Sequence, residues 1–269
     1  MRLILIVVNL CIALCATAQN EIQYFSDENF AFEVKQIDEF IERFNNSENT
    51  LIRQYIKDNY GKKDLPRQEI LKSLFNQKDE SWSLRDVDLF ITQIVNRDYN
   101  LQFEDKDWYA KLDCSVDYLG EEFPMTMIMN VERNQKTNAK KWVITSVNAQ
   151  FLDIPESSDK SKSINPASHG TNFIALDRAL EDTSNMKNYV SSDFNPDQLT
   201  LFMSLLSCKK VSIKQVDRIQ YHFLQFEGWA FTVKNFERDD KNSGWLISKL
   251  ERLDDYQKDE YKKSILNLK

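Results

Sequence analysis

A motif that occurs twice limits the possible folds of this chain more than any other feature. Asn130–Arg133 (Asn-Val-Glu-Arg) is followed by a polar connection and by the β-rich run Trp142–Val147. Asn235–Arg238 (Asn-Phe-Glu-Arg) is followed in the same way by Trp245–Leu250. Two β-rich runs joined by a polar, turn-forming connection are typical of a β-hairpin. We therefore expect two copies of one structural unit, each ending in the same hairpin.

Helical patterns precede strand patterns in each copy. In the first copy a Ser83-x-x-Asp86 cap is expected to start a helix, and alternating strands follow it. In the second copy Asn195 is the expected N-cap and Pro196 the first residue of an apolar helix. This order predicts the α+β class, with helices packed on a curved antiparallel sheet in each copy.

The expected division of the chain follows from a change in composition. Residues 153–170 are rich in Ser, contain two prolines and have almost no apolar side chains, which is typical of a linker. The sequence therefore predicts a first domain at 19–152 and a second at 171–252, related closely enough to superpose. Residues 253–269 are highly charged, and we expect a helix with a solvated face there.

The first residues have the pattern of a secretion signal. Arg2 precedes the apolar run Leu3–Leu14, and Ala16–Ala18 forms the small-x-small pattern that signal peptidase recognises. We therefore expect 1–18 to be a signal peptide and the protein to be exported through the inner membrane, to the periplasm or the extracellular space. A lipoprotein would instead use Cys15, but the residue before it is bulky. No stretch is long and apolar enough to predict a membrane span.

Charge and residue spacing exclude several functions. The formal net charge is −7, and an acidic surface repels phosphate backbones, so we expect no nucleic-acid partner. The five glycines are scattered singly, which excludes both common phosphate-binding loops. His169 and His222 lie too far apart for an HExxH motif and have no spacing typical of a metal site. We expect neither a metal nor a cofactor.

Two cysteines lie beyond the expected signal peptide. In an oxidising compartment Cys114 and Cys208 could form a disulfide. Cys114 falls on the expected core face of a strand, and two buried thiols are the alternative. The sequence leaves both possibilities open.

A resemblance to a known family rests on three features of the sequence. They are the order of helices before a strand meander, the paired Asn-x-Glu-Arg hairpins, and Ser168–Gly170 at the start of the second copy. The chain resembles secreted bacterial proteins of the nuclear-transport-factor-2-like, cystatin-like superfamily with two domains in tandem. This resemblance implies two cone-shaped domains, each a bent sheet around helices with a pocket at its open end. Some members are isomerases or dehydratases and many only bind or dimerise, so fold alone does not transfer an activity.

Six residues are candidates for lining such a pocket. His222 is a possible general base or polar contact, with Tyr221 beside it; the alternative is a strand histidine bonded to its surroundings. Four tryptophans, Trp108, Trp142, Trp229 and Trp245, could stack on a flat ligand, or instead anchor the sheet to its helices. The alternating Met125, Met127 and Met129 could form an adaptable binding face, or fill a core. No catalytic residue is assigned.

The sequence thus favours an exported, non-enzymatic binding or interaction protein. Its partner would be a small molecule, peptide, glycan, lipid or envelope protein. The alternative is an isomerase, dehydratase or hydrolase that uses His222 or Tyr221 in a pocket of the second domain. A third possibility is a homodimer formed through a sheet face.

Overall fold

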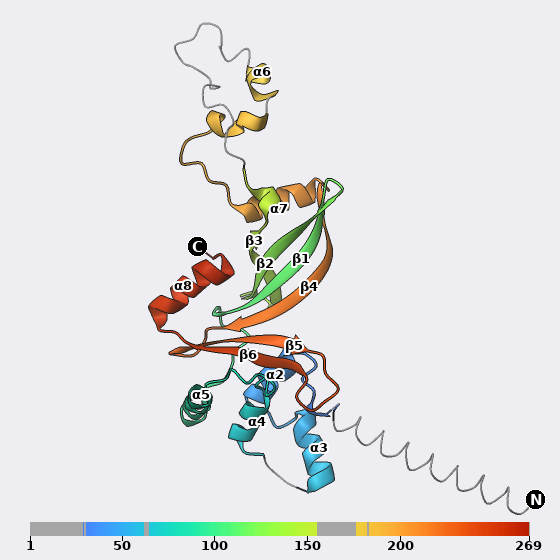
Figure 1. Ribbon diagram of the computed structural model, residues 1–269, viewed down its shortest axis with the longest axis vertical. Coiled ribbons are helices and arrows are strands. Elements are labelled where there is room, and N and C mark those ends of the chain that lie inside the picture. The colour runs from blue at the N-terminus through green and yellow to red at the C-terminus, as the bar shows by residue number, and fades with distance from the viewer. Residues whose placement is uncertain (1–28, 30, 62–64, 155–175, 182, 269) are drawn as a thin grey trace, which may run out of the picture. The chain divides into compact units, whose positions relative to one another are not determined.

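The computed structural model describes residues 29, 31–61, 65–154, 176–181 and 183–268 (Figure 1). The expected signal peptide, residues 155–170 of the expected linker, and His169 lie outside them. The helices are α2 (Ile37–Phe44), α3 (Leu51–Tyr60), α4 (Arg67–Ser73), α5 (Leu84–Asn96), η1 (Gln150–Leu152), α6 (Leu176–Glu181), η3 (Thr183–Tyr189), α7 (Gln198–Ser207) and α8 (Asp255–Leu266). The strands are β1 (Trp108–Tyr118), β2 (Glu121–Arg133), β3 (Lys140–Asn148), β4 (Val211–Phe223), β5 (Trp229–Phe236) and β6 (Gly244–Arg252). In this part of the chain no helix is both long and apolar enough to cross a membrane.

Both repeated hairpins belong to one six-stranded antiparallel sheet. Its strand order is β3-β2-β1-β4-β5-β6, which confirms the α+β class and places one hairpin at each edge. The expectation of a separate sheet for each copy is wrong. A three-stranded meander standing alone would leave the backbone groups on the outer side of β1 or β4 unpaired. Pairing β1 with β4 satisfies both strands.

The chain forms two compact units, and neither follows the expected boundaries at 19–152 and 171–252. Of the described residues, unit 1 contains those up to Lys111 and those within Asn130–Val143 and Ile219–Ile265. Unit 2 contains those within Leu112–Met129 and Ile144–Arg218 and those from Leu266 onward. Each unit therefore contains parts of both sequence copies. Each also has its own hydrophobic core, which is the physical reason for the division.

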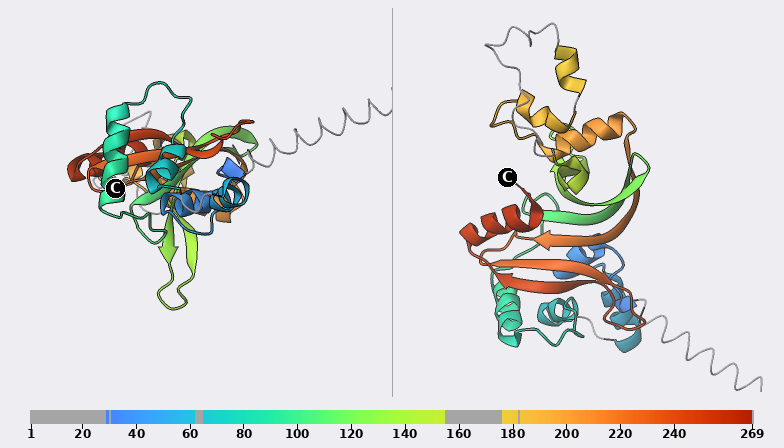
Figure 2. Two further views of the ribbon diagram at one scale, coloured as in Figure 1. Left: turned by 90° about the horizontal axis from the view of Figure 1, so that it is seen from below. Right: turned by 45° about the horizontal axis from the view of Figure 1, so that its top comes forward.

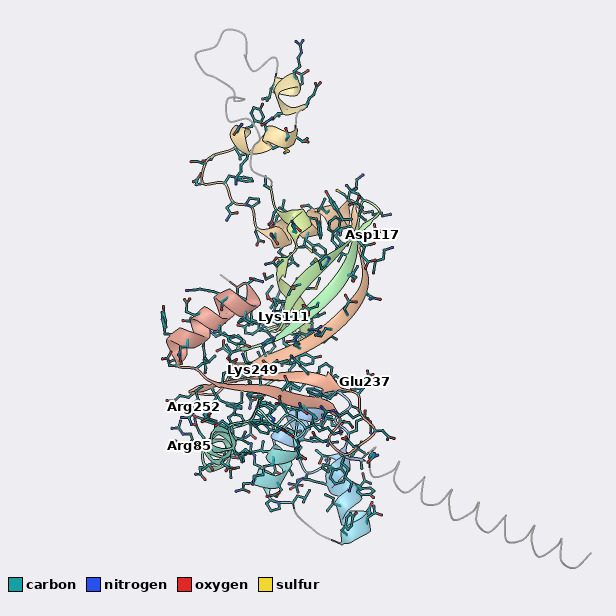
Figure 3. All side chains as sticks on the ribbon, viewed as in Figure 1. Arg85, Lys111, Asp117, Glu237, Lys249 and Arg252 are labelled. Carbon is teal, nitrogen blue, oxygen red and sulfur yellow. The ribbon has the colours of Figure 1, made fainter. Side chains whose placement is uncertain are left out.

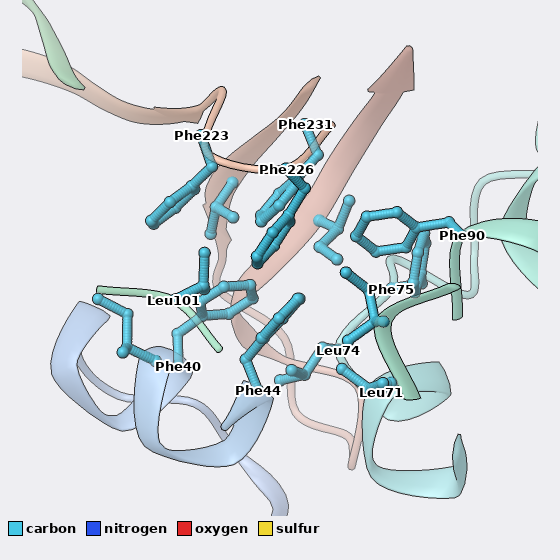
Figure 4. Packing of buried hydrophobic residues seen from close by; sticks show 14 of the residues in the cluster. Phe40, Phe44, Leu71, Leu74, Phe75, Phe90, Leu101, Phe223, Phe226 and Phe231 are labelled. Carbon is cyan, nitrogen blue, oxygen red and sulfur yellow. The ribbon is translucent and has the colours of Figure 1, made fainter. Parts of the chain in front are cut away.

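The core of unit 1 combines aromatic and aliphatic side chains from its helices and its strands (Figure 4). In this unit α2, α4 and α5 lie on one side of β5 and β6, and α8 lies on the other (Figures 1 and 2). The ring of Phe44 on α2 stacks on Phe226 at 5.5 Å between centroids, and Phe223 stacks on Phe231 at 4.9 Å. Phe40 and Phe44, one helical turn apart, are fully buried, so a helix as short as α2 depends on this packing for its stability.

The core of unit 2 contains the alternating methionines. Met125 and Met127 are buried beside Cys114, with Phe202 from α7 against them, so core filling is the correct interpretation of these methionines. Cys114 and Cys208 are both free thiols, the first buried and the second exposed at the end of α7. The disulfide is not formed, and only one of the two thiols is buried.

One predicted helix cap is confirmed and one is corrected. Ser83 caps α5 by accepting a hydrogen bond from the backbone N–H of Asp86, as expected. Trp229, Phe231 and Val233 of β5 lie in the core of unit 1. The start of α7 is different: Asp197, not Asn195, is the N-cap, and its carboxylate accepts from the N–H of Thr200. A carboxylate interacts favourably with the positive end of the helix dipole, which favours this later start.

The outer edge of β6 is covered by two short pieces of the N-terminal half. Val34 pairs with Gly244, donating to the carbonyl of Ser243 and accepting from the N–H of Trp245 at 2.8 Å. Phe75 pairs with Ile247 further along the strand. These contacts satisfy backbone groups that an open edge would expose.

Replacing Gly244 with alanine should destabilise the protein by roughly 2–3 kcal/mol, because a left-handed conformation and a steric clash coincide there. Gly244 has φ +82°, and a Cβ atom at this position would lie 2.1 Å from the carbonyl oxygen of Val34. Gly61, at the end of α3 with φ +62° and nothing within 4 Å, is the matched control. Gly61→Ala should cost only about 1 kcal/mol. Urea unfolding of both variants measures the difference, and equal losses would contradict the clash.

Candidate functional site

Four of the six expected pocket residues form one aromatic row in unit 1, defined as Trp142, Trp108, Tyr221 and Trp245. They come from β3, β1, β4 and β6. The Trp108 ring lies 4.9 Å from Trp142 and 6.2 Å from Tyr221, and Tyr221 lies 4.9 Å from Trp245. Strand alternation brings the four rings to one face of the sheet although they are far apart in the sequence.

The aromatic row is mostly a structural element. Trp108 is fully buried, stacks on Phe223 at 5.3 Å, and donates its indole N–H to the carbonyl of Phe103. Tyr221 is half-buried, and its pKa is raised chiefly by burial and further by the charge of Asp38. Trp142, 39% exposed, is the member most open to solvent. The row therefore anchors the sheet and offers at most the ring of Trp142 to a ligand.

Trp229 lies apart from this row. Its ring packs edge-on against Phe90 of α5 at 5.5 Å, and its indole N–H donates to the side-chain oxygen of Gln93. The guanidinium of Arg252 lies 5.1 Å from the ring centre. These contacts fasten α5 to β5, so Trp229 anchors the sheet to a helix.

His222 lies on the other face of the sheet, beneath α8. Its Nδ1 is 2.7 Å from the hydroxyl of Tyr261, and the residue is only 3% exposed. Burial, and then the charges of Lys111, Lys234 and Lys249, lower its pKa to about 3. Two of these lysines, Lys111 and Lys249, are labelled in Figure 3. The imidazole is therefore neutral at ordinary pH.

This geometry does not suit a catalytic base. The Nδ1 of His222 is occupied by Tyr261, and its Nε2 is buried without a hydrogen-bond partner among the described residues. A general base must reach the proton that it removes from the substrate. Within the described ranges no group of three His, Cys, Asp or Glu side chains could hold a metal ion.

Unit 2 contains a cavity of about 680 Å³ that the sequence did not indicate. Its walls come from η1, η3, α7 and the loop between η3 and α7, and apolar side chains predominate in them. Leu201 and Leu205, one helical turn apart, line it from α7 and also pack against the core of unit 2, in which Phe202 is buried. Because these leucines contact the core as well, the sequence of α7 carries no separate signal for the cavity.

The polar groups of α7 at this cavity already have partners. The side-chain amide of Gln198 donates to Asp153 at 2.7 Å, and its oxygen accepts from the N–H of Ala149. The hydroxyl of Ser204 donates to the carbonyl of Thr200. The α7 wall therefore presents a ligand with apolar surface and with polar groups that are already hydrogen-bonded.

Comparisons with known proteins give no match to a family model, to a curated protein or to a solved structure.

Proposed function

We propose that this chain is an exported, non-enzymatic binding protein that holds a small apolar molecule in the cavity of unit 2. The observation that carries the proposal is the cavity itself. Its volume lies within the range of ligand pockets, roughly 300–1,000 Å³, and such pockets are mostly apolar. Export is proposed from the sequence pattern of residues 1–18 alone.

The resemblance to the nuclear-transport-factor-2-like superfamily supports the same class of function, since many of its members bind ligands without catalysis. Helices precede a three-strand meander in both halves of the chain, which favours this membership. The enzyme alternative has less support, because the buried His222 offers no group to a substrate.

Binding of N-phenyl-1-naphthylamine, whose fluorescence rises in apolar sites, tests the proposal. We expect saturable binding to the full chain. Leu205→Trp, which fills the cavity, should weaken binding about tenfold to a hundredfold, because overpacking typically costs 1–3 kcal/mol. The matched control is Met203→Trp, on the same helix but 48% exposed and outside the cavity lining.

Both variants should remain folded, which their urea unfolding curves will show. Met203→Trp should bind the probe as the parent chain does. Absence of saturable binding, or equal losses in the two variants, would contradict the proposed function.

A further inference from the structure

We infer that the cavity of unit 2 takes the hydrocarbon chain of a single-chain amphiphile and leaves the polar head of that molecule in water. This inference rests on the binding function proposed above and specifies its ligand class. It follows from three properties of the cavity: the chemistry of its walls, the state of its polar groups, and the exposure of its mouth.

The walls provide apolar area on fixed elements. Phe151 stacks on Tyr118 of β1 at 4.9 Å, and Leu152 is buried in the core of unit 2. Leu201 and Leu205 extend the apolar wall along α7. Side chains held by a core keep their positions, so a hydrocarbon chain meets a surface that is already formed.

The polar groups of the α7 wall offer few free hydrogen-bonding positions to a sugar or a peptide. Such ligands need hydrogen-bond partners, because a polar group buried without one destabilises the complex. On the α7 wall Gln198 is bonded to Asp153 and to the backbone of Ala149, and Ser204 is bonded within the helix. A hydrocarbon chain needs none of these groups and leaves their bonds intact.

The mouth is open to solvent and contains apolar side chains beside polar ones. Met186, Val190 and Phe194 line the cavity and are still between 41% and 53% exposed. A hydrocarbon chain can therefore enter along these apolar side chains, and the exposed polar residues Ser192 and Asn195 also border the cavity. Lys187 lines it together with Asp153 and Asp193, one cation against two anions, and a head group that stays in water meets this charge only through a screened interaction.

Displacement of N-phenyl-1-naphthylamine from the full chain by monomeric amphiphiles tests the inference. Across octanoate, decanoate and dodecanoate, affinity should rise about fourfold per added methylene, since burying one CH₂ is worth about 0.8 kcal/mol. At equal chain length, dodecanoate, dodecylphosphocholine and dodecyl maltoside should bind within about threefold of one another, because the head stays in water. Leu205→Trp should reduce the chain-length dependence, and Met203→Trp should preserve it.

The outcomes separate the two proposals. If the probe binds and Leu205→Trp weakens it, but affinity is independent of chain length or differs more than about tenfold among the three heads, the inference is wrong and the binding function stands. If the probe does not bind saturably, both fail.

Discussion

Replacing Arg43 with methionine should lower the free energy of unfolding by about 3–5 kcal/mol, the range typical of breaking a buried ion pair from one side. Arg43 is 1% exposed and forms an ion pair with Glu39. Its guanidinium donates to the carbonyls of Ala31, Phe32 and Glu33 at 2.6–3.0 Å. Methionine would fill the space but leave these carbonyls and one carboxylate oxygen of Glu39 without this donor, while the other oxygen keeps its hydrogen bond from the N–H of Lys35.

Urea unfolding at neutral pH measures this effect. Arg133→Met is the matched control, because Arg133 also pairs with a carboxylate, that of Glu104, but both side chains are more than 40% exposed. This control should leave stability nearly unchanged. Similar losses in the two variants would show that the buried contacts of Arg43 are not important. Removal of the Arg43 guanidinium should also weaken the backbone pairing of Val34 with the outer edge of β6, since Arg43 binds the carbonyls immediately before Val34.

Acid should destabilise the protein through His222, and His222→Asn should remove that contribution. The pKa of His222 is about 3 in the folded state and near 6.5 in the unfolded state. The unfolded state therefore binds the extra proton first, and the contribution is complete above pH 6.5 and is lost as pH falls towards 3. The expected loss is about 3 kcal/mol at pH 4.5 and about 4 kcal/mol near pH 3.

Unfolding free energies of parent and variant between pH 7 and pH 4.5 measure this contribution, since carboxylates titrate in both chains and cancel in the difference. Asparagine keeps an acceptor for the Tyr261 hydroxyl but does not titrate. Tyr261→Phe should retain the acid sensitivity, because burial is the largest cause of the low pKa. Identical pH profiles for the parent and His222→Asn would contradict this account.

Local structure was largely predictable because its causes lie within a few residues. The side chain of Ser83, for example, caps the helix that it precedes. The pairing of β1 with β4 was not predictable in this way. This pairing joins two strands that are separated in the sequence by the whole expected linker. The residues of neither strand indicate which other strand it will pair with.

The candidate site was predictable only in part. Trp108 and Tyr221 were predicted only as candidate pocket residues, and the structure brings their rings to 6.2 Å from one another. The partner of His222 was missed, because Tyr261 belongs to a charged helix that was expected to be solvated. Within that helix Lys258 and Leu266 are also buried, and the buried positions are too few to give a clear apolar stripe.

The order in which unit 1 is completed has a consequence for synthesis of the chain. A ribosome delivers α2 to α5 well before β5 and β6, yet Phe40, Phe44 and Phe90 pack on Phe231 of β5. The helices therefore emerge with no partner surface for their aromatic faces, and the unit can close only after Ile219–Ile265 has been made. A chain cut short before β5 retains these helices without the strand on which they pack. Such a fragment should aggregate or depend on a chaperone.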